Sequence, residues 1–138
     1  MNIKRVGNVI LAVKDLDKSI KFYNEIIGLP IKQQRRTWVD LGSKGGALLS
    51  LHPASLTAPH VGTSIENGVT IGFIVGDVKS AVEELRSKGV KIYRDVIDRE
   101  SGKNAIILDP DDYMISLFEP NFKDKDQQTT GYQGFTPV

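Results

Sequence analysis

The sequence predicts an α+β fold of two βαβββ modules in tandem, related by a pseudo-twofold axis. The main support is an internal repeat, because VGNVILAVKDLDKSIKFYNEIIGLPI has a counterpart in NGVTIGFIVGDVKSAVEELRSKGVKI. Each copy consists of an apolar strand, an Asp, an amphipathic helix, a Gly and a second aliphatic stretch. Three short strand-like runs then follow each helix. Two curled mixed sheets with the helices on their outer faces would form an open cup.

The first strand of each copy alternates between two faces, as expected of a strand with one buried side. One face is uniformly apolar and suits packing under a helix. Its members are Val9, Leu11, Val13, Ile71, Phe73 and Val75. The opposite face is therefore expected to line the cup.

Each predicted helix has a start signal and a stop signal. Asp15 and Asp77 stand where an N-cap carboxylate accepts the first free backbone N–H groups. Gly28 and Gly89 stand where a left-handed residue ends a helix. Between these signals the apolar residues fall at helical spacing. They are Leu16, Ile20, Tyr23 and Ile27 in the first helix, and Val78, Ala81, Val82 and Leu85 in the second.

The strand-like runs after each helix complete the two modules. They cover residues 31–36, 37–41 and 47–52 after the first helix, and 91–98, 104–108 and 113–118 after the second. Stretches rich in turn residues separate them, namely GSKGG in the first half and RESGKN and DPDDY in the second. The order β-α-β-β-β therefore occurs twice.

One domain is expected over residues 1–120, with modules at 4–53 and 67–120. The connector, residues 54–66, is rich in Pro, Ser, Thr and Gly, which favours a flexible linker over a lid folded across the cup. The polar tail, residues 121–138, has no helix or strand period and is expected to be an extended arm or disordered.

Composition excludes several classes of function. The 138 residues carry 18 Lys and Arg against 17 Asp and Glu, so no overall field attracts nucleic acid or an anionic membrane. The absence of Cys excludes disulfides, thiolate metal sites and a Cys nucleophile. The N-terminal apolar run is too short for a signal-peptide core or a membrane span. We expect a cytoplasmic protein without nucleic-acid or membrane partners.

Two stretches, VKDLDKSIKFYNEIIGL and DPDDYMISLFEP, resemble the glyoxalase/bleomycin-resistance/dioxygenase superfamily, also called the vicinal oxygen chelate proteins. The resemblance covers about residues 4–120 and implies the same cup-shaped fold. It also implies a homodimer, formed either by pairing complete chains or by exchanging modules. The matching motifs are structural and do not specify a reaction.

Metal-using members of this family carry one ligand on the first and one on the last strand of each module, typically His, Gln or Glu. The resemblance places these positions at Asn8, Ser50, Thr70 and Ser116. All four are short and neutral, whereas a catalytic divalent ion prefers imidazoles and ionised carboxylates. We therefore expect no metal ion and no other cofactor, which disfavours glyoxalase I, extradiol dioxygenase and metal-dependent epimerase activity.

Strand parity predicts a cup with an apolar wall and a few hydrogen-bonding groups, as small-molecule sites commonly have. The expected ligand-binding residues are Asn8, Ile10, Arg36, Trp38, Leu48, Ser50, His52, Thr70, Met114, Ser116 and Phe118. His52 is the candidate for a general base or a ligand-orienting group. A half-exposed histidine at a strand end, without a chemical role, is the favoured interpretation. His60, in the connector, is expected to be exposed.

The stretch IKQQRRTWVDL has two equally weighted interpretations. Arg36 beside Trp38 would hold a planar anionic ligand by a charge-assisted hydrogen bond and stacking. Alternatively, the charges keep an edge strand soluble.

These observations favour a metal-independent protein that binds a small organic ligand in the cup. The first alternative is a lyase, isomerase or dioxygenase-like enzyme of the same superfamily with a non-standard active site, in which His52 or Arg36 moves a proton or stabilises an anion. The second is a former enzyme that acts through protein contacts, with the 121–138 tail as the contacting arm.

Overall fold

The computed structural model describes residues 1–54 and 68–121. The chain divides into two compact units, Met1–Gly62 and Thr63–Val138, whose βαβββ elements we call module 1 and module 2. The predictions for the connector, for His60 and for the tail fall outside the described residues, apart from residues 54 and 121. Within the two described ranges, no helix has the length and apolar character needed to cross a membrane.

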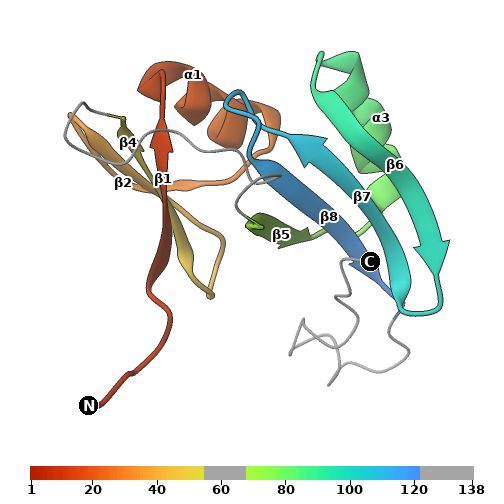
Figure 1. Ribbon diagram of the computed structural model, residues 1–138, viewed down its shortest axis with the longest axis horizontal. Helices are drawn as coiled ribbons and strands as arrows, with labels where there is room; N and C mark the ends of the chain where they lie inside the picture. The colour runs from red at the N-terminus through yellow and green to blue at the C-terminus, as the bar shows by residue number, and fades with distance from the viewer. Residues whose placement is uncertain (55–67, 122–138) are drawn as a thin grey trace. The chain divides into compact units, whose positions relative to one another are not determined.

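Module 1 is a four-stranded mixed sheet with one helical segment (Figure 1). Its elements are β1 (Asn8–Val13), α1 (Leu16–Ile20), the π-helix η1 (Lys21–Ile26), β2 (Ile31–Arg35), β3 (Trp38–Leu41) and β4 (Leu48–Pro53). The strand order is β1-β4-β3-β2, with β1 parallel to β4 and the other pairs antiparallel.

Module 2 repeats this order. Its elements are β5 (Thr70–Ile74), α3 (Val78–Ser87), β6 (Lys91–Arg99), β7 (Gly102–Leu108) and β8 (Met114–Pro120). The sheet order is β5-β8-β7-β6, again with the first strand parallel to the last. Asn8 pairs with Leu48 as Thr70 pairs with Met114, so the two modules also share their register. The predicted α+β fold of two βαβββ modules is confirmed.

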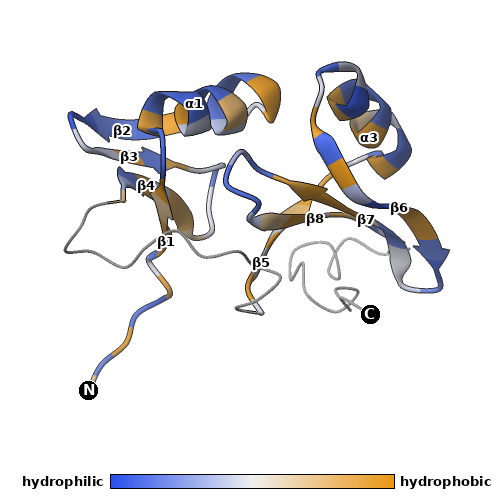
Figure 2. Cartoon of the chain, turned by 45° about the horizontal axis from the view of Figure 1, so that its top comes forward, coloured by the Kyte–Doolittle hydropathy of each residue, from blue (hydrophilic) through white to orange (hydrophobic). Residues whose placement is uncertain are grey.

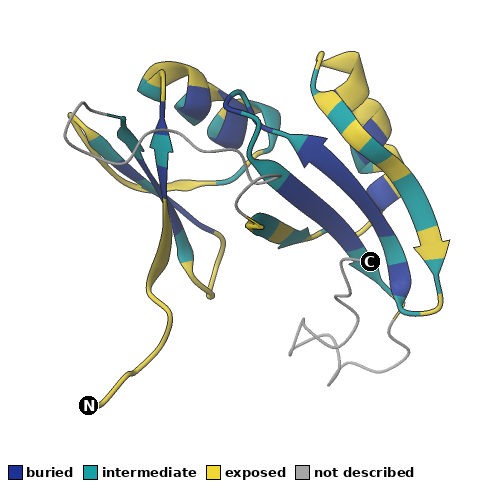
Figure 3. Cartoon of the chain, in the orientation of Figure 1, coloured by how far each residue is buried: buried dark blue, intermediate teal, exposed yellow. Residues whose placement is uncertain are grey.

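Each helix lies along one face of its own sheet, α1 against β4 and α3 mainly against β6 (Figure 2). In α3 the buried residues are Val78, Val82 and Leu85, as the spacing predicts. Burial in module 2 is concentrated on β7 and β8, which are dark blue in Figure 3.

The first helical segment departs from the predicted stripe. Only Tyr23 of that stripe is fully buried, and its buried companions are Ser19 and Phe22. The cause is the π-helical turn, in which the Ile27 N–H donates to the Phe22 carbonyl five residues back, at 2.9 Å. The wider turn allows two consecutive rings to face inward, and Phe22 meets Tyr23 edge to face, with ring centroids 5.0 Å apart.

The predicted helix signals are present in both modules. The Asp15 carboxylate accepts from the Lys18 N–H at 3.1 Å, and the Asp77 carboxylate accepts from the Ser80 N–H at 3.0 Å. Beyond the helices, Gly28 and Gly89 have φ values of 91° and 81°, which favour glycine. Both helices are therefore bounded by local sequence.

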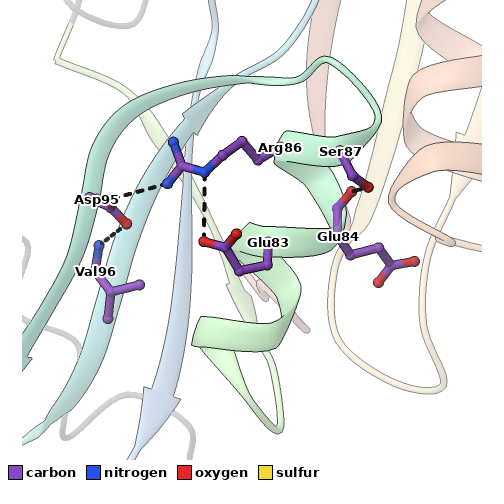
Figure 4. Close-up of polar contacts among 6 residues, drawn as sticks. All are labelled: Glu83, Glu84, Arg86, Ser87, Asp95 and Val96. Carbon is purple, nitrogen blue, oxygen red and sulfur yellow. Dashed lines mark hydrogen bonds and ion pairs between the residues drawn. The ribbon is translucent and has the colours of Figure 1, made fainter.

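An exposed ion-pair group joins α3 to β6 (Figure 4). Arg86 donates through Nη2 to the Asp95 carboxylate at 3.0 Å, and its Nε lies 3.6 Å from Glu83. The side chains of Arg86 and Asp95 are 46% and 68% exposed, so solvent screening makes this ion pair a weak contributor to stability.

We predict that Asp77 stabilises module 2 in a pH-dependent way. Hydrogen bonds from the Ser80 N–H and hydroxyl hold the pKa of Asp77 below its ordinary value of 3.8. The stabilisation is therefore present above about pH 3.8 and is lost as the pH falls through the lower, folded-state value. Asp77→Asn keeps a cap but cannot titrate, so its stability difference from the parent should shrink below pH 3.8 in urea unfolding. The exposed Asp98→Asn control should not remove this pH dependence.

We also predict that Gly102 tolerates no side chain. It begins β7 with φ 147°, and a Cβ there would lie 2.2 Å from the Glu119 carbonyl oxygen. Gly102→Ala should destabilise the fold by about 1–3 kcal/mol from the backbone conformation alone. Gly76→Ala is the matched control, because its Cβ would meet nothing within 4 Å. Equal unfolding midpoints for the two variants would contradict this turn geometry.

Candidate functional site

The face of the module 1 sheet that its helix leaves uncovered carries a polar row. Apolar residues on the other face are buried under the helix, as β3 and β4 show. Alternation therefore turns the intervening residues to the helix-free face. These residues are Asn8, Ile10, Ala12, Trp38, Asp40, Leu48, Ser50 and His52.

A hydrogen-bonded chain crosses three strands of this face. Asn8 donates through Nδ2 to the Ser50 hydroxyl at 3.0 Å, and that hydroxyl donates to Asp40 Oδ1 at 2.5 Å. The Trp38 indole N–H donates to the same carboxylate oxygen at 2.8 Å. Ser50 is fully buried, and it faces Asp40 in the β3–β4 register. The carboxylate is therefore held by two donors on the sheet surface.

Trp38 and His52 form an aromatic pair beside this chain. Their rings are nearly parallel, at 8°, with centroids 5.8 Å apart, and both residues are half-buried. His52 Nδ1 lies 2.9 Å from the Pro53 carbonyl oxygen, which can only accept, so Nδ1 donates there. In the neutral imidazole, Nε2 is then left as the acceptor.

Arg36 does not join this arrangement. β2 ends at Arg35, and Arg36 lies exposed in the turn that precedes β3. The predicted strand over residues 31–36 is therefore one residue too long, because the hairpin needs two residues to reverse. The polar group bound to Trp38 is Asp40, which is not among the ligand-binding residues that strand parity predicts.

Module 2 carries its own polar chain on the helix-free face. Asn104 donates through Nδ2 to the Ser116 hydroxyl and to the Leu117 carbonyl, and its Oδ1 accepts from Arg94 Nη2. Ser116 and Phe118 are buried, while Thr70 and Met114 are half-buried. Asn104 and Arg94 are not among the site residues predicted from sequence.

A hollow of about 210 Å³ lies elsewhere in module 2, at the β6–β7 hairpin. Its lining residues are Asp98, Gly102, Lys103, Glu119, Pro120 and Asn121. Glu119 accepts from the Val78 N–H at the start of α3 at 2.9 Å and lies 3.6 Å from the Lys103 ammonium. These contacts give Glu119 a structural role in holding the helix.

The residues at the four positions that the resemblance assigns to metal ligands do not fit a catalytic divalent ion. Asn8 and Ser50 use their polar atoms in the chain to Asp40, and Ser116 accepts from Asn104. The four positions supply an amide and three hydroxyls, and Asp40 adds one carboxylate in module 1. Across residues 1–54 and 68–121, no three His, Cys, Asp or Glu side chains gather as a metal site would require.

Fold and sequence place the chain in a known family. Residues 5–117 match the Glyoxalase/Bleomycin resistance protein/Dioxygenase superfamily, so the chain belongs to this superfamily. The match spans both modules and confirms the family expected from the two motifs.

Three proteins illustrate the similarity. A lactoylglutathione lyase from Schizosaccharomyces pombe is 31% identical over 147 residues, which cover 85% of this chain and 48% of that protein, so the chain spans about half its length. A probable lactoylglutathione lyase from Vibrio parahaemolyticus is 29% identical, covering 86% of this chain and 93% of that protein. TnmS3, an antibiotic binding protein from Streptomyces sp. CB03234, has a TM-score of 0.69 at 24% identity, covering 88% and 99% of the two chains. This last likeness shows a shared fold.

We predict that Ser50→Ala destabilises module 1 by about 1–2 kcal/mol, because it removes two hydrogen bonds at a buried position. Urea unfolding measures the loss, with the exposed Ser43→Ala as the matched control. The emission of Trp38, the single tryptophan, should change in the same variant because its bonded carboxylate loses a donor. An unchanged unfolding midpoint would contradict the hydrogen-bonded chain.

Proposed function

We propose that this protein binds a small, planar organic molecule on the helix-free face of its sheets, without a metal ion or other cofactor. The observation that carries the proposal is the parallel Trp38–His52 pair, next to the carboxylate of Asp40. In a stacked pair of half-buried rings, an outer ring face and the ring edges are what a planar ligand could stack against.

Polar groups around the aromatic pair would orient the ligand. Asp40 and His52 Nε2 present hydrogen-bond acceptors beside the rings, and Ile10 adds exposed apolar surface. Small-molecule sites commonly combine apolar walls with a few convergent polar groups. Of the positions expected from sequence, we assign ligand contact in module 1 to Asn8, Ile10, Trp38, Leu48 and His52, with Ser50 as a positioning residue.

The proposal also includes the open cup and ligand contact by four residues of module 2, namely Thr70, Met114, Ser116 and Phe118. Ser116 and Phe118 are buried, so a ligand on module 2 would first meet the half-buried Thr70 and Met114. Arg36, in its exposed turn, would contact only a ligand extending past the β2–β3 hairpin.

A second candidate function is suggested by the relatives named lactoylglutathione lyase, at 29–31% identity. That activity would have to use this chain's neutral side chains at the four family ligand positions. Titration with Zn²⁺, Ni²⁺ and Mn²⁺, followed by an assay for lactoylglutathione formation, separates the candidates. Tight stoichiometric metal binding with activity would favour the lyase and overturn metal-independent binding.

We predict that planar aromatic compounds quench Trp38 fluorescence on binding, because the ligand would stack against the indole. Trp38→Ala should weaken binding at least about tenfold, or about 1.4 kcal/mol, by calorimetry. The exposed Tyr93→Ala on β6 is the matched control and should bind like the parent. Equal affinities for both variants would refute the aromatic pair as the binding surface.

Three further expectations complete the proposal. We expect a homodimer and a cytoplasmic location. We also expect no nucleic-acid or membrane partner, because the formal net charge is only +1. Sedimentation equilibrium of the full chain would measure the oligomeric state.

A further inference from the structure

We propose that module 2 binds an oxyanion, a carboxylate or phosphate group, at Arg94 on the helix-free face of its sheet. The residues that form this site are distinct from the Trp38–His52 pair. The inference therefore stands independently of the function proposed above.

The register places Arg94 on the helix-free face. Arg94 faces Ile106 across β6 and β7, and Ile106 faces Ser116 across β7 and β8. Residues paired in this way project to the same side of a sheet. The following residue, Asp95, projects to the opposite side, where Arg86 of α3 binds it.

The charge of Arg94 is not compensated within the described part of the chain. Its bonding partner is the neutral amide oxygen of Asn104, and no carboxylate in residues 1–54 or 68–121 lies within ion-pair distance. Burial and the like charge of Arg99 both lower the pKa of Arg94. The surroundings of Arg94 thus disfavour its charged form, and the amide oxygen of Asn104 does not supply a counter-charge.

One guanidinium nitrogen has a specific unmet requirement. Nη1 of Arg94 is buried and has no acceptor among the described residues. A buried donor without a partner is unfavourable, and more so when it carries charge. An oxyanion reaching the guanidinium would supply both an acceptor and a counter-charge, in the geometry that arginine favours.

The amide that holds Arg94 is itself fixed. Asn104 is buried and gives its Nδ2 to the Ser116 hydroxyl and the Leu117 carbonyl, so its Oδ1 must face the guanidinium. Arg94 is thereby oriented before a ligand arrives. Preorganisation of this kind reduces the entropy that binding must overcome.

Benzoate, phenyl phosphate and the neutral benzamide test the proposal on the full chain. Titrations followed by the NMR signal of the Arg94 Nε–H should show benzoate or phenyl phosphate binding at least about tenfold more tightly than benzamide. The relative affinities of the two anions distinguish a carboxylate site from a phosphate site. Arg94→Gln should abolish the preference for anions, whereas Arg86→Gln, on the helix side, should retain it.

Asn104→Asp provides a second, independent variant. It places a carboxylate next to Arg94, so the chain should fold with the arginine internally paired and lose at least about tenfold in anion affinity. Circular dichroism confirms folding. Trp38→Ala should leave anion binding unchanged, which separates this site from the proposed function. Anions that bind no better than benzamide, or retained anion affinity in a folded Asn104→Asp, would overturn the proposal.

Discussion

In each module the parallel pairing of the first strand with the last brings together residues that are distant in sequence. Asn8 and Ser50 are 42 positions apart, yet β1 and β4 place them within a hydrogen bond. The helix of the module occupies one face of the sheet, so alternation along each strand places the polar chain on the other, helix-free face. The link from Asn8 into the module 1 chain depends on this pairing, whereas the aromatic pair and the module 2 chain lie across antiparallel strands.

Much of this arrangement is encoded locally. The repeat, the capping carboxylates Asp15 and Asp77, and the glycines that end the helices predict the element order because each acts within a few residues. Strand alternation likewise predicts the burial of Leu11 and Val13 on β1. It does not predict that Val9, on the same face, is 39% exposed, or that Ser50, on the helix-free face of β4, is fully buried. The π-turn at Phe22 was not predictable from a regular helical period, because its hydrogen bond spans five residues and departs from that period.

The composition of the polar chains could not be predicted in the same way. Asp40, Asn104 and Arg94 gain their significance from neighbours on other strands, and the register that joins them was unknown. A signal did exist for Asp40, since an acidic residue flanked by Val39 and Leu41 in a short strand must project to the open side. For Arg94, β6 contains register shifts, so counting along the strand would not have fixed its side.

Because the two modules share their register, each position on one sheet can be matched with a position on the other. The Trp38 position of β3 corresponds to Asn104 of β7, and that of His52 corresponds to Phe118. The pairing of the last two strands has the same register in both halves, while the side chains at these matched positions differ. Module 1 carries an aromatic pair beside a carboxylate at these positions, and module 2 carries an amide that holds a guanidinium. A doubled scaffold can thus change the chemistry of one half while the other keeps its own.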